Sequence, residues 1–403
     1  MENILKGKHI VLGVCGGIAA YKSVELLRLM KKQEAEVRVI MTRNAGWFVG
    51  QMTFEALSGL PVCSDMFEEG QDASIKHIDW AEQADAAVIA PATANMIGKL
   101  AGGIADDFLS TFMLAVTAPV LVCPSMNSNM YDSRPMRRNL EVLRQDGYRV
   151  LSPGAGELAC GTCGPGRLPE AAEILDRLTA ALSPKDLKGR RVLVTAGPTR
   201  EPIDPVRYVS NPSSGKMGYA VARAAEYRGA EVVLVAGPNH LSAPLNVTVV
   251  PVNTAREMAQ AVFDHMEDTH IVIKTAAVSD YRPAAAAPQK IKKTDDEMVL
   301  RMVKNQDILK ELGRRKKGHI LVGFAAETEA LENNASKKLS QKNLDIIAGN
   351  LVDHPAYGFG SDDNKMTLFY RDGSREAVPA MTKEALAHEL LDRVVGRFLT
   401  ADG

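Results

Sequence analysis

The same local pattern occurs twice in this chain, and it constrains the fold more than any other feature. The segment "KGKHIVLGVCGGIAAYKSVELLRLM" begins at Lys6, and "KGRRVLVTAG" begins at Lys188, followed later by "GYAVARAAEYRGAEVVLVAG". Each copy contains a short β-branched run, a glycine-bearing turn, an amphipathic helical stretch and a second apolar run. This order is typical of the start of a doubly wound α/β domain. The sequence therefore predicts two α/β domains.

Further apolar runs extend both domains. They cover residues 86–92, 119–126 and 148–154 in the first half, and 247–252, 271–278, 319–327 and 344–350 in the second. Because these runs are continuously apolar and alternate with helical segments, they indicate mainly parallel sheets covered on both faces. The end of the chain predicts a hairpin turning at Asp372-Gly373 and then a closing helix. We expect two Rossmann-like domains, the first of them flavodoxin-like.

A polar segment with a proline, "SPKDLKGR", separates the two copies and predicts a division into residues 1–185 and 186–403. The chain has 48 basic and 49 acidic residues. This balance argues against a nucleic-acid or membrane-surface protein that binds by bulk charge. Five cysteines, with no signal segment and no apolar run of membrane length, favour a cytoplasmic protein.

Three turns in the first half follow strands, where open α/β sheets bind their ligands. The first, "GVCGGIAAYKS", has small residues that would let a phosphate approach backbone amides, but its glycines lack the G-x-G-x-x-G spacing. The others are "APATANMIGKLAGG" and "PSMNSNM". Thr93, Asn95 and Asn127 in these turns could equally cap helices. Taken singly, the turns leave ligand binding and capping open.

The segment "ELACGTCGPGRLPE" carries Cys160 and Cys163 in a Cys-x-x-Cys frame. A structural zinc site needs four ligands, and no second pair accompanies this one. A redox pair is expected at a helix N-terminus after a strand, whereas the glycines here predict a loop. Two interpretations remain, a loop with one working thiol or two incidental cysteines. His77 is a lone histidine, a kind that is more often structural than catalytic.

Four segments of the first half, taken in order, are "GGIAAYKS", "PATAN…GKLAGGIADD", "P.MN..M" and "ACG..GPGR.PE". With these segments the first half resembles the flavin-containing cysteine decarboxylases, phosphopantothenoylcysteine decarboxylase among them. The resemblance implies bound FMN, which oxidises the thiol side of the substrate to a thioaldehyde so that CO₂ can leave and an enethiol is formed. It implies that Cys160 donates a proton, that His77 lies at the flavin and substrate, and that Asn127 holds the substrate carboxylate. Cys163 matches no catalytic position. FMN contacts are implied for Gly17, Ser23, Thr42, Thr93, Asn95 and Ala105. The family also implies a trimer with its site between subunits.

In the second half, "VTAGPTREPIDPVRYVSNPSSGKMG" resembles the tail of a P-loop but fails the Walker A pattern, because Met217 follows Lys216. It still places Ser213, Ser214 and Gly215 where a helix begins, which suits a phosphate. The alternative is a capped helix start. Several nearby anion ligands favour binding, namely Arg200, Arg207, Asn211 and Lys216.

Together with "KTAAVSDYRP", "KIKK", "GFAAET" and "SKKLSQKNLDIIAGN", this segment makes the second half resemble phosphopantothenate–cysteine ligase. The resemblance implies that CTP and Mg²⁺ activate 4′-phosphopantothenate as an acyl-cytidylate, which the cysteine amine then attacks. Lys290 matches the lysine tied to forming that intermediate, with Lys292 and Lys293 as alternatives, and Asn211 matches the residue tied to its conversion. Implied nucleotide contacts are Asp280, Lys290, Phe324, Lys338 and Lys342, with Asp280 also a ligand for Mg²⁺. A dimeric ligase half fused to a trimeric decarboxylase half implies a homo-oligomer such as a dodecamer. Both halves together are similar to the bifunctional enzymes of coenzyme A biosynthesis.

Two other functions are compatible with two α/β domains. A reductase binding FMN and NAD(P)H is disfavoured because neither half has a G-x-G-x-x-G turn. A flavin-binding regulatory subunit need not keep both His77 and Cys160, and it would not carry a complete ligase half.

Overall fold

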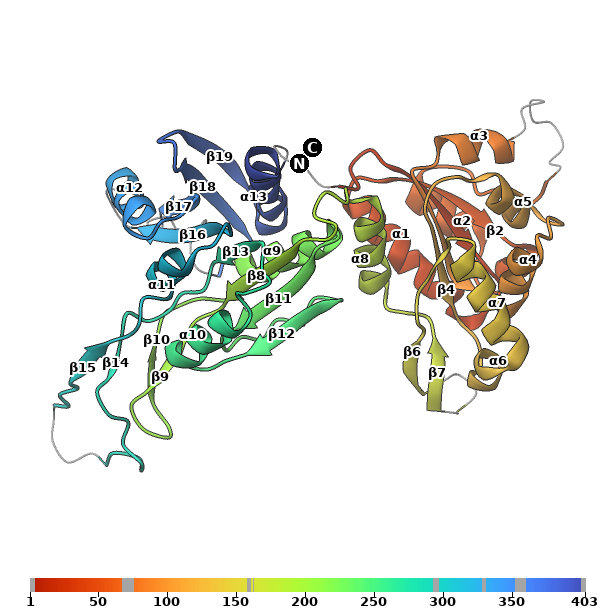
Figure 1. The fold of residues 1–403 in the computed structure, drawn as a ribbon. Coiled ribbons are helices and arrows are strands. Elements are labelled where there is room, and N and C mark those ends of the chain that lie inside the picture. Colours follow the sequence, from red (N-terminus) through yellow and green to blue (C-terminus); the bar gives the residue numbers. More distant parts are fainter. Residues whose placement is uncertain are drawn as a thin grey trace. The chain divides into compact units, whose positions relative to one another are not determined.

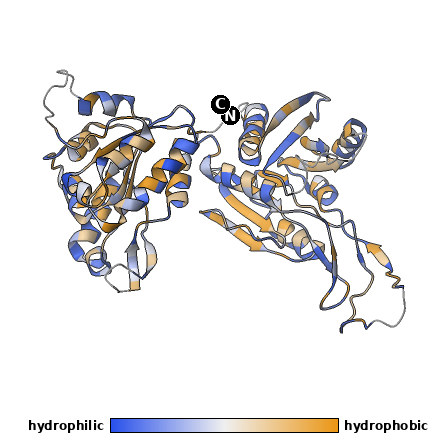
Figure 2. Ribbon diagram, turned by 180° about the vertical axis from the view of Figure 1, so that it is seen from behind, coloured by the Kyte–Doolittle hydropathy of each residue, from blue (hydrophilic) through white to orange (hydrophobic). Residues whose placement is uncertain are grey.

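The protein is described by a computed structural model that covers residues 4–66, 76–157, 161, 163–292, 297–327, 331–351 and 360–399. The chain forms two compact units, one within residues 2–183 and one within 184–403 (Figure 1). In each unit the apolar strands run through the middle, between helices that turn polar residues outward (Figure 2). Among the described residues, no helix is long and apolar enough to cross a membrane.

The N-terminal unit is built on five parallel strands in the order β2-β1-β3-β4-β5. Their bounds are β1 (His9–Val14), β2 (Glu36–Met41), β3 (Ala86–Ala92), β4 (Val120–Pro124) and β5 (Arg149–Val150). This strand order is that of flavodoxin-like sheets, in which the direction of winding reverses between the first and third strands. The flavodoxin-like expectation is therefore confirmed.

Alternate residues of β1 face opposite cores, as the period of a strand requires. Leu12 packs on one face with α1 (Lys22–Lys32), α2 (Gln51–Ser58) and α8 (Ala171–Leu182). Val11 packs on the other face. The helices there are α3 (Lys76–Gln83), α4 (Ala94–Gly102), α5 (Phe108–Ala115) and α7 (Arg134–Gln145). Short helices η1 (Ile18–Tyr21), η2 (Arg43–Trp47) and α6 (Ser128–Asp132) lie in the turns after strands.

The glycine-rich segment after β5 differs from the predicted loop. Its described residues form an antiparallel ribbon of β6 (Gly154–Glu157) and β7 (Cys163–Arg167). Met126 donates its backbone N–H to the Gly166 carbonyl, which ties the ribbon to the turn after β4. Cross-strand pairing thus organised a segment whose composition alone indicated irregular backbone.

The C-terminal unit has an eight-stranded sheet in the order β12-β11-β8-β13-β16-β17-β18-β19. Its strands are β8 (Arg191–Ala196), β11 (Glu231–Ala236), β12 (Val247–Pro251), β13 (Ile271–Lys274), β16 (Ile320–Glu327), β17 (Ile346–Leu351), β18 (Asp363–Tyr370) and β19 (Arg375–Thr382). All pairs are parallel except those that join β18 to β17 and β19. The Rossmann-like fold and the hairpin at Asp372-Gly373 are confirmed.

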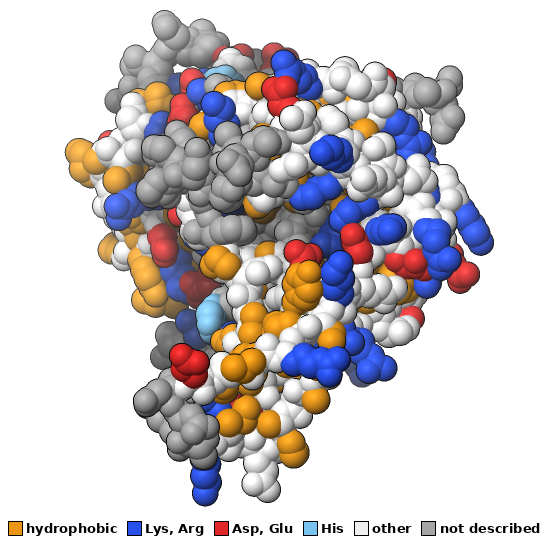
Figure 3. Space-filling model, turned by 90° about the vertical axis from the view of Figure 1, so that its left-hand side faces the viewer, with side chains coloured by type: hydrophobic (Ala, Val, Ile, Leu, Met, Phe, Trp, Pro, Cys, Tyr) orange, Lys and Arg blue, Asp and Glu red, His pale blue; other side chains and the backbone are white. Residues whose placement is uncertain are grey.

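Helices cover both faces of this sheet. α9 (Lys216–Tyr227) and α13 (Lys383–Phe398) bury one face. α10 (Ala255–Asp264), α11 (Ile308–Arg315) and α12 (Leu331–Gln341) bury the other. Two ribbons, β9 (Arg200–Pro202) with β10 (Tyr208–Ser210) and β14 (Tyr281–Pro283) with β15 (Met302–Lys304), reach away from the sheet as an arm (Figure 1). The arm carries exposed apolar side chains, which appear in the lower part of Figure 3 and include Val206, Tyr208, Tyr281, Met298 and Val299.

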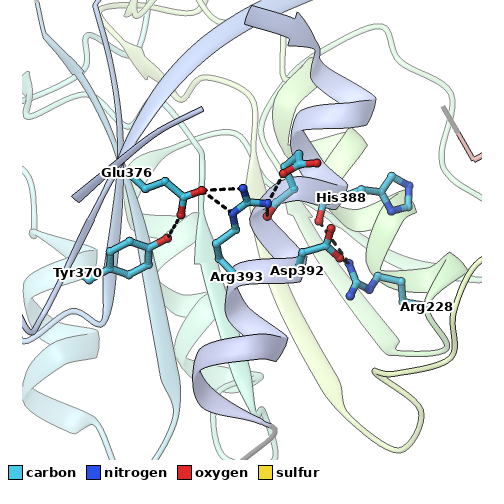
Figure 4. Close-up of polar contacts among 7 residues, drawn as sticks. Arg228, Tyr370, Glu376, His388, Asp392 and Arg393 are labelled. Carbon is cyan, nitrogen blue, oxygen red and sulfur yellow. Dashed lines mark hydrogen bonds and ion pairs between the residues drawn. The ribbon is translucent and has the colours of Figure 1, made fainter. Parts of the chain in front are cut away.

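A buried arginine holds α13 on the sheet. Arg228 is 1% exposed, and its guanidinium pairs with Asp186 and with Asp392, the latter at 2.7 Å (Figure 4). Arg393 pairs with Glu376 at 2.7 Å, which ties the same helix to β19. Removing one partner of Arg228 would leave a buried charge uncompensated, so its contact with Asp392 fixes the C-terminal half of α13.

Candidate active sites

The N-terminal cavity, of about 980 Å³, lies at the carboxyl edge of the first sheet. Its walls come from the turns after β1, β2, β3 and β4 and from the β6–β7 ribbon. This is the switch point where open α/β sheets bind ligands. Cofactor cavities commonly span roughly 300–1,000 Å³, so the volume suits a large, ring-bearing molecule.

The floor of this cavity needs a glycine. A Cβ at Gly16 would lie 2.5 Å from the Asn44 Cβ and 2.6 Å from the Asn44 backbone carbon. The turns after β1 and β2 are therefore in contact, and no larger residue fits between them. Two capping side chains also line the cavity. Thr93 accepts a hydrogen bond from Met96 N at 3.3 Å, and Asn127 accepts one from Asn129 N at 2.8 Å. Capping and cavity lining, left open by the sequence, thus occur together.

Charge in the N-terminal cavity favours an anion. Four basic residues line it, Lys22, Arg43, Lys99 and Arg167, against two acidic ones, Asp107 and Glu157. Burial opposes the charged form of Lys99, but hydrogen bonds to Asp106 and Asp107, both at 2.5 Å, raise its pKa overall. A phosphate-bearing ligand fits this excess of cations.

The structure brings most of the predicted flavin contacts together. Gly17, Thr42, Thr93 and Asn95 line the N-terminal cavity, and so does Asn127. Ser23 is buried, and its hydroxyl donates to the Ala90 carbonyl at 2.5 Å. Ala105 is exposed and is not among the lining residues.

Of the other predicted catalytic residues of this half, His77 lies away from the cavity lining and Cys160 is not described. His77 is on α3, edge-on to the Phe108 ring at 6.2 Å between centroids, and is not among the lining residues. Cys160 lies outside the described residues, although Glu157 and Arg167, on the two strands of the ribbon, both line the cavity. Cys163 is an exposed, free thiol.

Sequence reasoning missed the cations of this cavity. Lys22 lies within the quoted turn, and its Nζ donates to Glu170 at 3.0 Å, while Arg167 comes from the ribbon. The available signal was a basic residue within or beside a glycine-bearing segment, such as Lys22 after Gly17 and Arg167 after Gly166. Burial raises the pKa of the Cys15 thiol to about 12, so this cysteine is neutral and is not a nucleophile.

The C-terminal cavity, of about 150 Å³, lies at the carboxyl edge of the second sheet. It is lined by residues 213–218, residues 275–277, Phe324 and Asn350, and also by Lys383. Gly215 has φ +78°, a left-handed conformation that glycine adopts readily. A Cβ at Gly218 would lie 2.5 Å from both Ala196 Cβ and Thr275 Oγ1. These glycines let the start of α9 reach the sheet edge, where the partial positive charge of a helix N-terminus suits a phosphate.

A second group of charges surrounds Lys274, at the end of β13. Burial, followed by repulsion from Lys342, lowers the pKa of Lys274 to about 8. Asp307, Asp280 and Lys338 also act on it electrostatically, and Lys342 pairs with Asp307 at 2.8 Å. The predicted nucleotide contacts Asp280, Lys338 and Lys342 therefore gather around a lysine that the sequence reasoning had not selected.

The remaining predicted ligase residues lie along the same edge and the arm. Asn211 donates to the carbonyls of Ala277 and Val278, both at 3.2 Å. Lys290 is exposed, next to Ile291, whose N–H donates to Asp204 at 3.1 Å. Lys292 is described, whereas Lys293 lies outside the described residues.

Two of the predicted anion ligands have structural contacts instead. Arg200 stacks on the Tyr208 ring, with its guanidinium carbon 4.7 Å from the centroid. Arg207 pairs with the buried Asp204 at 2.5 Å, and it holds the pKa of that carboxyl well below its usual range.

Comparison with known proteins gives matches along nearly the whole chain. A family model described as "Flavoprotein" matches residues 2–183, and one described as "DNA/pantothenate metabolism flavoprotein C-terminal domain" matches residues 187–398. The chain is 47% identical over 395 residues to the Coenzyme A biosynthesis bifunctional protein CoaBC of Bacillus subtilis, covering 97% of each chain. It is also 47% identical over 399 residues to the protein of that name from Escherichia coli K12, covering 98% of each.

The chain belongs to the family of bifunctional coenzyme A biosynthesis proteins. A crystal structure of the C-terminal domain of one CoaBC protein is 44% identical and covers 52% of this chain and 96% of that one, with a TM-score of 0.45. The N-terminal cavity lies wholly within the residues matched by the first family model, and the C-terminal cavity wholly within those matched by the second. Each half of this family member therefore carries its own candidate site.

Proposed function

We propose that the two halves catalyse consecutive steps of coenzyme A biosynthesis. The C-terminal half ligates 4′-phosphopantothenate to cysteine with CTP, and the N-terminal half decarboxylates 4′-phosphopantothenoylcysteine to 4′-phosphopantetheine. The observation that carries this proposal is identity of 47% to CoaBC proteins across 97% of the chain, with a separate cavity in each half. The corresponding functional domains are residues 1–185 and 186–403.

FMN fits the N-terminal cavity. We assign the FMN phosphate to the basic residues that line the cavity. Its first candidate ligands are Lys22 and the backbone amides that follow Gly17. When bound, FMN supplies the oxidation of the substrate thiol carbon and the later return of a hydride. Asn127, in the turn after β4, holds the substrate carboxylate. Cys160, which falls between β6 and β7 in the sequence, would deliver the proton to the carbon that has lost CO₂.

In this proposal a neighbouring copy completes the decarboxylase site. His77 is assigned to the flavin and substrate, yet it is not among the described residues that line the cavity of its own chain. A trimeric N-terminal half would supply it from the next subunit. With a dimeric C-terminal half, the assembly is a closed homo-oligomer such as a dodecamer. We place the enzyme in the cytoplasm, on the basis of its small number of cysteines.

In the ligase half, the cations neutralise the triphosphate while its α-phosphorus is attacked by the carboxylate of 4′-phosphopantothenate. Lys290 stabilises the charge that develops as pyrophosphate leaves, and Asn211 orients the acyl-cytidylate for attack by the cysteine amine. Phe324, Lys338 and Lys342 complete the nucleotide site. Mg²⁺ is usually held by one or two carboxylates together with substrate phosphates, and Asp280 is the proposed protein ligand.

A coupled assay tests the proposal. Purified protein is incubated with 4′-phosphopantothenate, cysteine, Mg²⁺ and CTP, and both products are followed by mass. We expect 4′-phosphopantothenoylcysteine first and 4′-phosphopantetheine after it. Absence of the first product with every nucleotide triphosphate supplied would overturn the ligase assignment. Absence of the second from a yellow, flavin-loaded preparation would overturn the decarboxylase assignment.

Two substitutions separate the halves. Cys160→Ser should stop formation of 4′-phosphopantetheine and leave ligation unchanged, whereas Lys290→Gln should stop CTP-dependent release of pyrophosphate. Lys292→Gln is the matched control for the second variant. If Lys290→Gln is active and Lys292→Gln is not, the role moves to Lys292.

A further inference from the structure

Lys383 is a buried cation that the proposed ligase mechanism does not use. It is the first residue of α13, only 8% exposed, and it lines the C-terminal cavity. A lysine is unfavourable at this position for two reasons. The first turn of a helix carries partial positive charge, and burial removes the water that would solvate the ammonium group.

A second lysine faces the same cavity. Lys216 is the first residue of α9, which has no acidic residue in its first turn, and it also lines the C-terminal cavity. The two lysines are far apart in sequence, and the fold brings them together. Burial, and then the charge of Lys216, lowers the pKa of Lys383. Two helix N-termini and two ammonium groups therefore converge on one small space.

Protein groups balance this charge only in part. Lys216 pairs with Asp362 at 2.7 Å and donates to the Gly360 carbonyl at 2.9 Å, but the Asp362 side chain is 86% exposed. Lys383 donates to the Ser361 carbonyl, a neutral acceptor. Asp362 and Asp363 act on Lys383 only as nearby charges. Among the described residues that line the cavity, two are basic and none is acidic.

The rest of the lining suits a phosphoryl group. The hydroxyls of Ser213 and Ser214 lie at the turn before α9, beside a helix N-terminus whose partial positive charge favours an anion. The volume of about 150 Å³ lies below the roughly 300 Å³ at which whole-ligand cavities begin. The space thus matches one part of a larger ligand rather than a complete one.

We propose that Lys383, together with Lys216, binds a phosphoryl group of a ligase substrate in the C-terminal cavity. The inference rests on the proposed ligase function. Two substrates carry that chemistry, namely CTP, through its triphosphate, and 4′-phosphopantothenate, through its phosphate ester. Lys383 is accordingly a substrate-binding residue, supplied by the last helix of the chain.

Calorimetric titration of the full-length protein tests this without relying on turnover. CTP with Mg²⁺, 4′-phosphopantothenate and unphosphorylated pantothenate are titrated separately into the wild type and Lys383→Met. Because a hydrogen bond to a charged group contributes roughly 1.5–3 kcal/mol, affinity for one phosphorylated substrate should fall about tenfold to hundredfold. Pantothenate binding should not change. The substrate that loses affinity identifies the source of the phosphoryl group.

Lys365→Met is the matched control, because Lys365 is an exposed lysine on nearby β18. Its affinities should equal those of the wild type. Thermal unfolding gives a second readout. Removing a buried charge that serves a ligand should leave the melting temperature unchanged or higher, whereas removing a structural lysine should lower it. Should Lys383→Met fail to fold, Lys383→Gln, which can still donate to Ser361, replaces it in the titrations.

Unchanged affinity for both phosphorylated substrates overturns the inference, and a lowered melting temperature with unchanged affinities assigns Lys383 to structure. The proposed function fails separately, if the wild type makes no 4′-phosphopantothenoylcysteine. Even then the titrations report on Lys383, because they measure binding alone.

Discussion

The affinity of the ligase half for CTP should fall as pH rises from 7 to 9, because Lys274 loses its charge in that range. Burial and the nearby Lys342 lower its pKa to about 8. Four charged groups interact electrostatically with Lys274. Lys338 lies in α12 and Lys342 directly follows that helix, whereas Asp307 precedes α11 and Asp280 follows β13. Lysines with an ordinary pKa near 10.4 keep their charge up to pH 9.

The size of the effect follows from the protonated fraction. With a pKa of about 8, that fraction falls from about 0.9 at pH 7 to about 0.1 at pH 9. If CTP binds only the protonated form, its dissociation constant should rise about tenfold across this interval. The phosphates of CTP are already ionised there, so they contribute little to the change.

Calorimetric titration of Mg²⁺ and CTP at pH 7, 8 and 9 measures this directly. Lys274→Gln should bind more weakly at pH 7 and show a flat profile, whereas Lys365→Gln, which alters an exposed lysine, should keep the wild-type slope. A flat wild-type profile, or the same slope in Lys274→Gln, would refute the reasoning.

Loss of folding cannot imitate this result. The folded-state pKa of Lys274 lies below its unfolded value near 10.4, so between about pH 8 and 10.4 the unfolded chain binds more protons. This lysine therefore makes the folded state more stable as pH rises through that window. Stability and CTP affinity should change in opposite directions.

Three further predictions concern other parts of the chain. Gly16→Val should give a folded protein without the absorbance of bound flavin, because even a Cβ at this position would lie 2.5 Å from the Asn44 side chain. A variant that is still yellow would contradict this. Unchanged ligation activity is the control for folding. Burial, and then the charge of Arg228, lowers the pKa of His388 to about 4. As pH falls below about 6.5, the histidine is therefore protonated in the unfolded state before it is protonated in the folded state. The free energy of unfolding of the C-terminal unit should consequently fall by about 2 kcal/mol between pH 8 and pH 5. Urea unfolding should show that loss in the wild type and a smaller one in His388→Gln; equal losses would assign the effect to other groups. Cys163→Ala should decarboxylate at the wild-type rate, as expected of an exposed free thiol with no catalytic role, and a slower rate in the product-mass assay would contradict this.

Much of the fold could be predicted because its signals are local. The apolar run at residues 86–92 became β3 with the same bounds, and the Asp372-Gly373 turn joins β18 to β19. Buried parallel strands need continuous apolar runs, and a hairpin needs turn residues between its strands. The loop predicted around Cys163 was wrong because ribbon pairing depends on hydrogen bonds to a partner strand, which glycine content does not reveal.

The sequence by itself determined the order of strands and helices and the turns that end at each sheet edge. Those turns carry Gly17, Thr93 and Asn127, and the geometry of parallel sheets brings them together. Only the tertiary structure decided which charges meet. Lys216 and Lys383 start helices far apart in the chain, and Lys274 ends a strand among groups from three later segments. Their pKa values and their use depend on burial and on neighbouring charges, because the free energy of a charge is set by its surroundings in space and not by its neighbours in sequence.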